Sequence, residues 1–298
     1  MSKILITGSS GFLGKHLVSM LSITNELYTL SRVNSNYSVD LSKNVPILNE
    51  KYDIVIHAAG FAHKINNESK NIFIDINVTG TLNLLRGLEI SAVPSKFVFI
   101  SSVSVYGLVS GYNIDESSEL LAKDPYGLSK IEAEKIILDW CNNNNVICTI
   151  LRLPLIAGIE PPGNLGSMIN SIKKGFYFNI ENGKSKKSMV LANDVAKYIL
   201  IAAEVGGVYN LTDGHHPSFY ELSNYISKQL KKKPPKNLNY LVIKVIALIG
   251  DLFGSNALIN SIKLRKITSN LTFDDTKARE IFLWNPTPIL KGFKISDK

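Results

Sequence analysis

Short apolar runs alternate with longer segments of mixed polarity along the first half of the chain. The runs at residues 3–7 and 53–57 are almost uniformly apolar and too short for a helix, which indicates buried strands. Residues 131–140 instead place apolar side chains at helical spacing among charged ones. By the same criteria we predict further strands at residues 26–30, 37–41, 96–102 and 146–153, and helices at residues 70–90 and ending near residue 21.

Alternating strands and helices predict an α/β fold with a doubly wound, Rossmann-type parallel sheet, which binds ligands at the carboxyl ends of its strands. The pattern becomes less regular after residue 155, and Pro161-Pro162-Gly163 interrupts it. We therefore predict a Rossmann domain over residues 1–155, with returning segments near residues 188–212, and a smaller mixed α/β part over residues 156–298. In the smaller part we predict helices at residues 165–174, 193–204, 218–230 and 241–253, and a strand at residues 208–211.

The composition is that of a globular domain, with 298 residues of which 45% are apolar and 19% charged. Residues 241–253 form the most apolar late run, but they include Lys244 and Asp251 and are shorter than the span of about 20 residues that a bilayer needs. We interpret this run as a buried or amphipathic helix. Met1 leads directly into a strand, so we expect no signal peptide, a cytoplasmic protein and no membrane partner.

The formal net charge of +8 raises the question of an anionic partner. The lysines concentrate at residues 184–187 and 231–236, without interleaved aromatic residues or a nucleic-acid motif, so we expect no nucleic-acid partner. The second run is interpreted as a solvated linker. The two cysteines, Cys141 and Cys148, have no partners at metal-ligand spacing, so we expect reduced thiols and no metal site.

Three glycines follow the first strand in the arrangement of a dinucleotide site. Gly8 permits a tight turn, Gly11 lets a pyrophosphate approach the backbone, and Gly14 lets the following helix pack closely on the strand. The second predicted strand ends in Ser31-Arg32, without the carboxylate that would hold the ribose of NAD. Because the Arg32 guanidinium can grip a 2′-phosphate, we predict a preference for NADP(H), with NAD(H) possible.

A tyrosine and a lysine four residues apart open the helix at residues 131–140. Asp124-Pro125 predicts its start, and the spacing places Tyr126 and Lys130 on one side. A phenol has an ordinary pKa of about 10, and a nearby ammonium lowers it towards neutrality. The pair can therefore serve in acid–base catalysis, although taken alone such a pair is more often solvated.

Together these stretches resemble the extended short-chain dehydrogenase/reductase superfamily. Residues 7–14 are similar to its TGxxGFxG fingerprint, and residues 126–130 to its tyrosine–lysine motif. Residues 57–60, 77–81, 101–107, 152–154 and 194–196 resemble further motifs in the same order. The ending at residues 275–279 and 284–287 is similar to that of the nucleotide-sugar epimerase/dehydratase branch.

The resemblance implies a catalytic set of Ser102, Tyr126 and Lys130. Ser102, four residues before Tyr106, would hydrogen-bond the substrate oxygen, with Ser101 as the alternative register. Tyr126 would exchange a proton, while Lys130 would hold the nicotinamide ribose and lower the pKa of Tyr126. Cofactor contacts are expected from Gly8, Ser10, Gly11, Phe12, Leu13, Arg32, Asp40, Leu41, Ala58, Ala59, Gly60, Asn77, Tyr126, Lys130 and Leu153. Substrate contacts are expected from His63, Ser104, Asn164 and Lys187 in the smaller, substrate-binding part and its surroundings.

The same resemblance implies a nucleotide-diphosphate sugar as substrate and a homodimer formed through the helix that carries Tyr126 and the helix before it. Dehydratases of this branch usually carry Asp-Glu after the serine, whereas Val103 and Ser104 follow it here, which disfavours a 4,6-dehydratase. Because Arg32 favours NADPH, we favour a 4-ketoreductase that acts on a nucleotide-linked 4-keto-6-deoxy sugar. The alternatives are an NAD-dependent nucleotide-sugar 4-epimerase of the UDP-sugar type, and a cofactor-binding protein without turnover.

Overall fold

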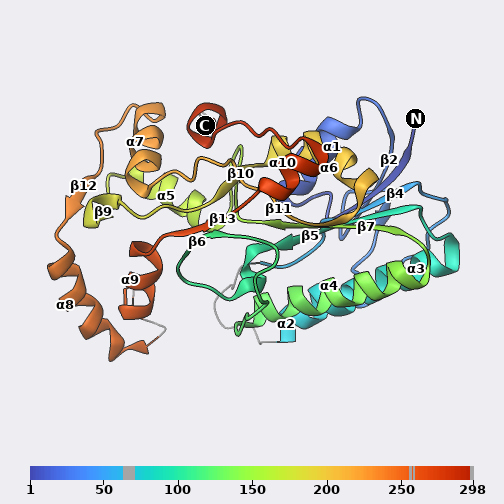
Figure 1. Ribbon diagram of the computed structural model, residues 1–298, viewed down its shortest axis with the longest axis horizontal. Helices are drawn as coiled ribbons and strands as arrows, with labels where there is room; N and C mark the ends of the chain where they lie inside the picture. Colours follow the sequence, from blue (N-terminus) through green and yellow to red (C-terminus); the bar gives the residue numbers. More distant parts are fainter. Residues whose placement is uncertain (63–70, 255–256, 258, 296–298) are drawn as a thin grey trace.

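A seven-stranded parallel sheet forms the centre of the computed structural model, which describes all residues except 63–70, 255–256, 258 and 296–298 (Figure 1). The strand order is β11-β7-β5-β4-β1-β2-β3, so the chain turns outward in both directions from β1 and β4. This is the doubly wound arrangement that the sequence predicts. The strands are β1 (Lys3–Thr7), β2 (Glu26–Ser31), β3 (Tyr37–Ser38), β4 (Ile54–His57), β5 (Lys96–Ser102), β7 (Ile147–Leu153) and β11 (Gly207–Asn210).

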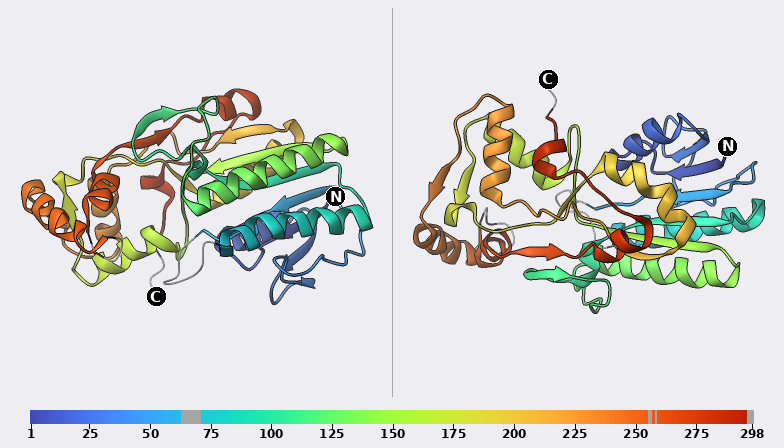
Figure 2. Two further views of the ribbon diagram at one scale, coloured as in Figure 1. Left: turned by 90° about the horizontal axis from the view of Figure 1, so that it is seen from below. Right: turned by 45° about the horizontal axis from the view of Figure 1, so that its top comes forward.

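Helices cover both faces of this sheet because its strands are apolar on both sides (Figure 1). One face packs against α1 (Phe12–Leu21), α6 (Ala192–Val205) and α10 (Thr276–Phe282) through a core cluster that includes Leu17 and Ile199. The other face packs against α3 (Gly80–Ser91) and α4 (Pro125–Asn143) through Leu84 and Ile137. Figure 2 shows α3 and α4 lying side by side.

The helix predicted at residues 70–90 has three sections. The described part begins with α2 (Asn71–Phe73), continues as a π-helix at Ile74–Thr79 and ends as α3. The Gly80 amide donates to the Asp75 carbonyl five residues earlier, which is the π-helical hydrogen bond. A helix that changes its pitch in this way shifts the side chains of the π turn, among them the buried Asn77.

Three short two-stranded pairs that the sequence pattern did not predict each include a strand of the C-terminal part, although β6 itself comes from the N-terminal 155 residues. Each strand has only three or four residues, and each pairs with a segment far away in the sequence. The pairs are β8 (Leu155–Ala157) with β10 (Met189–Leu191), β9 (Phe178–Ile180) with β12 (Lys236–Leu238), and β6 (Gly111–Ile114) with β13 (Leu271–Phe273). The helices of this part are α5 (Gly163–Lys173), α7 (Phe219–Gln229), α8 (Tyr240–Asp251), α9 (Ser261–Thr268) and α11 (Ile289–Gly292).

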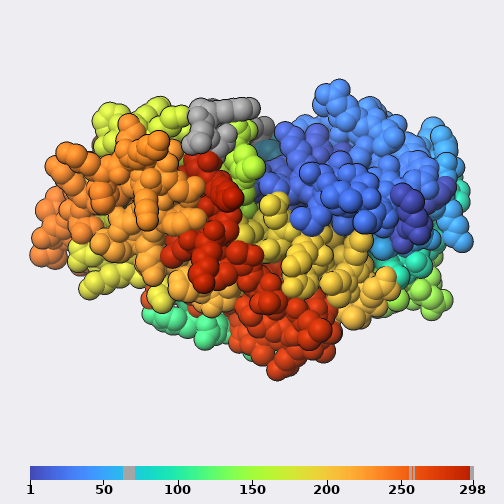
Figure 3. Space-filling model, turned by 90° about the horizontal axis from the view of Figure 1, so that it is seen from above, coloured from blue at the N-terminus to red at the C-terminus, as the bar shows by residue number. Residues whose placement is uncertain are grey.

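The last described residues connect the two parts of the molecule. Trp284 is buried in the core cluster above the sheet, whereas Ile289 and Phe293 are buried in the cluster around α5 and α7. Figure 3 shows this C-terminal segment, in red, crossing the surface between the N-terminal and C-terminal parts. Two elements from the C-terminal half of the chain also belong to the Rossmann part: β11 is an edge strand of the sheet, and α6 packs on one of its faces. The division of the chain at residue 155 stays a prediction.

Candidate active site

Tyr126 lies in the first turn of α4, close to the loop that follows β5. Asp124 caps the helix by accepting a hydrogen bond from the Gly127 amide at 3.0 Å, and Pro125 is its first residue, as the sequence predicts. A Cβ atom on Gly127 would lie 2.8 Å from the Ser104 carbonyl oxygen. The glycine therefore lets the start of α4 approach the short 3₁₀ helix at Val103–Tyr106, and Tyr126 comes next to Ser102.

The hydroxyl of Ser102 is held by the 3₁₀ helix that it caps. It accepts a hydrogen bond from the Ser104 amide at 3.1 Å and lies 3.1 Å from the Ser104 hydroxyl. The Tyr126 phenol lies close enough to Ser102 for this side chain to lower the pKa of the phenol. The structure thus brings the predicted serine and tyrosine together, and it places Ser104 where it orients Ser102.

The electrostatics of Tyr126 differ from the prediction. Burial raises the pKa of its phenol above the ordinary value, the neighbouring Ser102 side chain opposes this rise, and the Asp124 charge adds to it. Lys130 is not among the groups that shift this pKa. Tyr126 is therefore protonated at neutral pH and suited to donate a proton.

The Lys130 ammonium lies instead beneath the loop that follows β4. It donates to the Ile100 carbonyl at 2.9 Å and sits 4.5 Å from the centre of the Phe99 ring. A Cβ atom on Gly60 would lie 3.3 Å from it and 3.2 Å from the Asn77 side-chain oxygen. Burial lowers the pKa of Lys130 to about 8. The predicted cofactor residues Gly60, Asn77 and Lys130 therefore form one cluster.

Asn77 joins the elements around this cluster. Its side-chain oxygen accepts from the Phe61 amide at 2.7 Å, and its amide group donates to the Phe61 carbonyl and to the Ser129 hydroxyl at 2.9 Å. The π-helical turn thus fixes the loop of Ala58, Ala59 and Gly60 against α4. The role of Ser129 has no signal in the sequence, because a serine inside a helix is usually on the surface.

A buried charged network behind the serine loop is the main feature that the sequence analysis missed. Arg152 of β7 forms a bidentate ion pair with Glu134 of α4, at 3.1 and 2.7 Å. Ser101 hydrogen-bonds the same carboxylate, and Arg152 also donates to the Tyr106 hydroxyl at 3.1 Å. Glu134 is one of the charged residues among the apolar positions of the predicted helix, yet its side chain is only 3% exposed. The network fixes β5, β7 and α4 relative to one another.

His57 is a structural residue beside this centre. Its ring nitrogens lie 2.7 Å from the Thr7 hydroxyl and 3.0 Å from the Thr81 hydroxyl. Burial, with a smaller contribution from the Lys130 charge, lowers the pKa of His57 to about 3. The ring is therefore neutral at physiological pH and connects β1, β4 and α3.

The turn before α1 fits a dinucleotide diphosphate. Gly8 has a φ of +69°, and a Cβ atom there would lie 2.6 Å from the Ala59 amide nitrogen, so the turn requires glycine. Ser10 and Gly11 are exposed at the N-terminus of α1, where no side chain of the described residues caps the helix and its first turn holds no acidic residue. Phe12 and Leu13 belong to the same turn. The unpaired amides and helix dipole at this point suit an anion.

Arg32 follows β2 directly, and its side chain is exposed. It lies near Asp40, whose pKa is lowered chiefly by hydrogen bonds from Ser42, with a contribution from the Arg32 charge. Leu41 is buried beside it, and Leu153 of β7 is the register partner of Ser102. The predicted adenosine and nicotinamide residues thus lie along the carboxyl ends of the strands.

Two predicted substrate residues lie in the C-terminal part. Asn164 is exposed in the first turn of α5, and Lys187 is half-buried just before β10. Within the described residues, the Lys187 ammonium has no hydrogen-bonding or ionic partner, and burial lowers its pKa to about 8. A half-buried cation of this kind favours an anionic ligand. His63, which was predicted to line the sugar pocket, lies outside the described residues.

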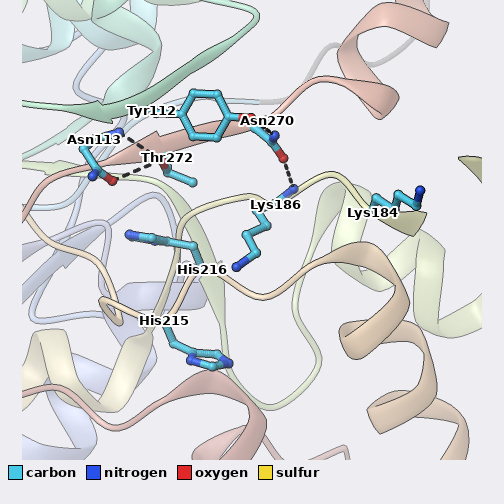
Figure 4. Close-up of a pocket in the computed structure, with 8 residues that line it drawn as sticks. All are labelled: Tyr112, Asn113, Lys184, Lys186, His215, His216, Asn270 and Thr272. Carbon is cyan, nitrogen blue, oxygen red and sulfur yellow. Dashed lines mark hydrogen bonds between the residues drawn. The ribbon is translucent and has the colours of Figure 1, made fainter. Parts of the chain in front are cut away.

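A basic pocket of about 380 Å³ lies on the C-terminal part, apart from the catalytic set (Figure 4). Its polar wall comes from β6 and β13, where the Asn113 amide donates to Thr272 at 2.9 Å. The Lys186 amide donates to the Asn270 side chain at 2.6 Å. The pocket is lined by Tyr112, Asn113, Lys184, Lys186, His215, His216, Asn270 and Thr272. Lys187 is not among them, so neighbouring lysines of this run serve different surfaces.

The sequence is similar to those of known proteins. A model of the NAD dependent epimerase/dehydratase family matches residues 4–212. A UDP-glucose 4-epimerase from Vibrio cholerae is 28% identical, over 98% of this chain and 93% of its own. A GDP-6-deoxy-D-mannose reductase from Pseudomonas aeruginosa is 28% identical, over 74% of this chain and 77% of its own.

The fold has similar solved counterparts. The structure of RMD from Pseudomonas aeruginosa complexed with NADPH matches with a TM-score of 0.74 and 22% identity, over 98% of this chain and 96% of that one. At this identity the similarity concerns the fold: a Rossmann-type sheet with the C-terminal part at the carboxyl ends of its strands.

Proposed function

The chain belongs to the NAD dependent epimerase/dehydratase family, and on that premise we propose that it is an NADPH-dependent reductase of a nucleotide-linked 4-keto-6-deoxy sugar. The observation that carries the proposal is Arg32, an exposed cation directly after β2 where NAD-specific sites hold a carboxylate. A guanidinium there recognises the 2′-phosphate of NADPH. A preference for NADPH favours net reduction of a substrate over epimerisation, in which a retained cofactor oxidises and then re-reduces the same sugar carbon.

The side chains around Ser102 support the same direction. When bound, NADPH supplies the hydride for the carbonyl carbon of the sugar. Tyr126, kept protonated by burial, donates its proton to the carbonyl oxygen, and Ser102 donates a hydrogen bond to the same oxygen. Lys130 holds the ribose beside Gly60 and Asn77. Lys187 and Asn164 bind the diphosphate of the substrate in the C-terminal part.

Turnover assays separate this reaction from its alternative. We expect the protein to consume NADPH in stoichiometric amounts with at least one member of a panel of nucleotide 4-keto-6-deoxy sugars. Interconversion of a gluco and galacto pair without added cofactor, and without NADPH consumption, would refute the reductase.

The second candidate is an NAD-dependent nucleotide-sugar 4-epimerase. It is favoured by the Vibrio cholerae UDP-glucose 4-epimerase, which aligns with nearly the whole chain. Both candidates use the same acid–base set and a nucleotide-diphosphate sugar, and they differ in whether the cofactor is consumed. A homodimer through α3 and α4 stays a prediction.

Replacing Arg32 by Asp should change the cofactor preference. We expect the Kd of NADPH to rise by at least about tenfold, because a charge-assisted contact is lost and a like charge faces the 2′-phosphate. The Kd of NADH should change little, as measured by fluorescence titration of each cofactor. Arg265→Asp, an exposed position on α9, is the control with the same change in net charge. Equal weakening of both cofactors by Arg32→Asp would contradict the assignment.

The pH dependence of substrate binding should report on Lys187. Its pKa is lowered to about 8, so the ammonium is charged below that pH and neutral above it. We therefore expect the KM of the sugar substrate to rise as the pH increases through this value. In Lys187→Arg the guanidinium stays charged, so the contribution of this residue to the rise should disappear. The pKa of Lys130 is also about 8, but its titration affects KM in both proteins and therefore cancels in the ratio of the two KM values. A ratio that does not change with pH would refute the role of Lys187 in substrate binding.

A further inference from the structure

Helix α8 exposes an apolar face that the fold leaves uncovered. Six of the nine residues at 241–249 are large, apolar and 46–68% exposed, namely Leu241, Val242, Val245, Ile246, Leu248 and Ile249. Leu252 and Phe253 continue the face at 84% and 67%. A soluble surface rarely gathers large apolar side chains in this way without a partner.

The geometry of the helix makes these side chains one continuous surface. Ile243, Ala247 and Gly250 form the narrow buried stripe, and Ile243 and Ala247 pack with Leu264 of α9. At 3.6 residues per turn, the six exposed residues cover about 160° of the opposite side. Lys244 and Asp251 both fall on one edge of this arc. The prediction of a helix with a buried side is therefore correct for this stripe. The side of α8 that faces solvent is apolar, however, whereas the exposed side of a surface helix is normally polar.

Exposed basic residues lie on α8 and on the elements next to it. Lys244 is exposed at the edge of the apolar arc, Lys236 is exposed on β12 just before the helix, and Arg265 and Lys266 are exposed on α9. Asp251 accepts hydrogen bonds from Ser261 at 2.6 and 2.8 Å, which occupies the carboxylate at the end of α8. Figures 1 and 2 place α8 at the outer tip of the C-terminal part, where a flat surface can reach it.

We propose that α8 docks this protein peripherally on an anionic lipid bilayer, with the apolar face among the acyl chains near the headgroups and the basic residues on the lipid phosphates. An apolar face combined with flanking lysines is the pattern that binds such interfaces. In the described part of the chain no helix has the length and apolarity to cross a bilayer, and docking does not require one. The prediction of no membrane partner rested on the absence of a spanning segment and on the interpretation of the late lysine run as a solvated linker.

Vesicle sedimentation of the full-length protein tests the proposal. We expect binding to vesicles of phosphatidylcholine with phosphatidylglycerol, and at least about tenfold weaker binding to phosphatidylcholine alone. Val245→Gln with Ile249→Gln should weaken binding to the anionic vesicles by a similar factor, since both residues lie on the exposed face. Lys236→Gln with Lys244→Gln, two exposed lysines next to the apolar face, should reduce that binding towards the level of neutral vesicles.

Matched substitutions keep the test specific. Ile23→Gln with Ile90→Gln alters two residues that are 78% and 80% exposed elsewhere, and it should leave vesicle binding unchanged. NADPH affinity verifies that each variant is folded. The proposal is overturned if the wild-type protein does not sediment with anionic vesicles, or if Val245→Gln with Ile249→Gln binds them as well as wild type. A wild-type dimer that these two substitutions dissociate, without vesicle binding, would assign the face to a second copy of the chain.

Discussion

Tyr126→Phe is expected to lower kcat by about 10²–10⁴-fold, because the substitution removes the proton donor and leaves the ring in place. The phenol lies beside Ser102, and its ring centre lies 6.0 Å from that of Phe73. A phenylalanine keeps the ring contact and loses only the hydroxyl. The affinity for NADPH should therefore stay close to that of wild type, as measured by titration.

The split between kcat and cofactor affinity identifies the role of Tyr126. Tyr220→Phe, at a position that is 48% exposed on α7, removes a hydroxyl without touching the site and should keep full activity. If Tyr126→Phe retained the wild-type kcat, Tyr126 would not be the proton donor. If wild type and variant bound the cofactor equally and neither turned over any substrate, the hypothesis of a cofactor-binding protein without turnover would be supported.

Glu134→Ala is expected to lower the free energy of unfolding by about 3–5 kcal/mol, because it leaves the buried Arg152 guanidinium without its counter-ion. Arg152 and Glu134 are 7% and 3% exposed, so water cannot replace the lost carboxylate. Urea denaturation of wild type and variant measures the difference. Loss of the Ser101 contact should also loosen the strand end that carries Ser102.

Two further variants separate the ion pair from general effects on α4. Glu132→Ala changes an exposed carboxylate two residues earlier on the same helix and should alter stability by no more than about 0.5 kcal/mol. Replacing both Glu134 and Arg152 by Met should recover much of the lost stability, since no buried charge is then left unpaired. A Glu134→Ala protein as stable as wild type would mean that the pair does not hold β7 and α4 together.

The sheet and its order of helices were predictable because their signals are local. A strand such as β4 is uniformly apolar, and the glycines before α1 specify a tight turn wherever the chain folds. Asp124-Pro125 likewise fixed the start of α4. The short strands β6, β8 and β12 could not be predicted, because each is specified by a partner strand far away in the sequence and not by its own residues.

Contacts between distant parts of the chain also explain which features of the site could not be predicted. The helical spacing of Tyr126 and Lys130 placed them on one side of α4, but it could not show that Ile100 and Phe99 hold the ammonium. Burial of Tyr126, which raises its pKa, depends on packing from several elements. The burial of Glu134 on α4 has no local signal in the sequence, because its partner Arg152 comes from β7, 18 residues later.

The central claim is net transfer of hydride from NADPH to the sugar, and isotope transfer tests it most directly. With NADPH deuterated at the transferable position of C4, a reductase should place one deuterium on C4 of the sugar for each NADP⁺ formed. Mass spectrometry and NMR of the product measure both. A product without deuterium, formed from a gluco or galacto sugar while NADPH remains unconsumed, would contradict the reductase and support the epimerase.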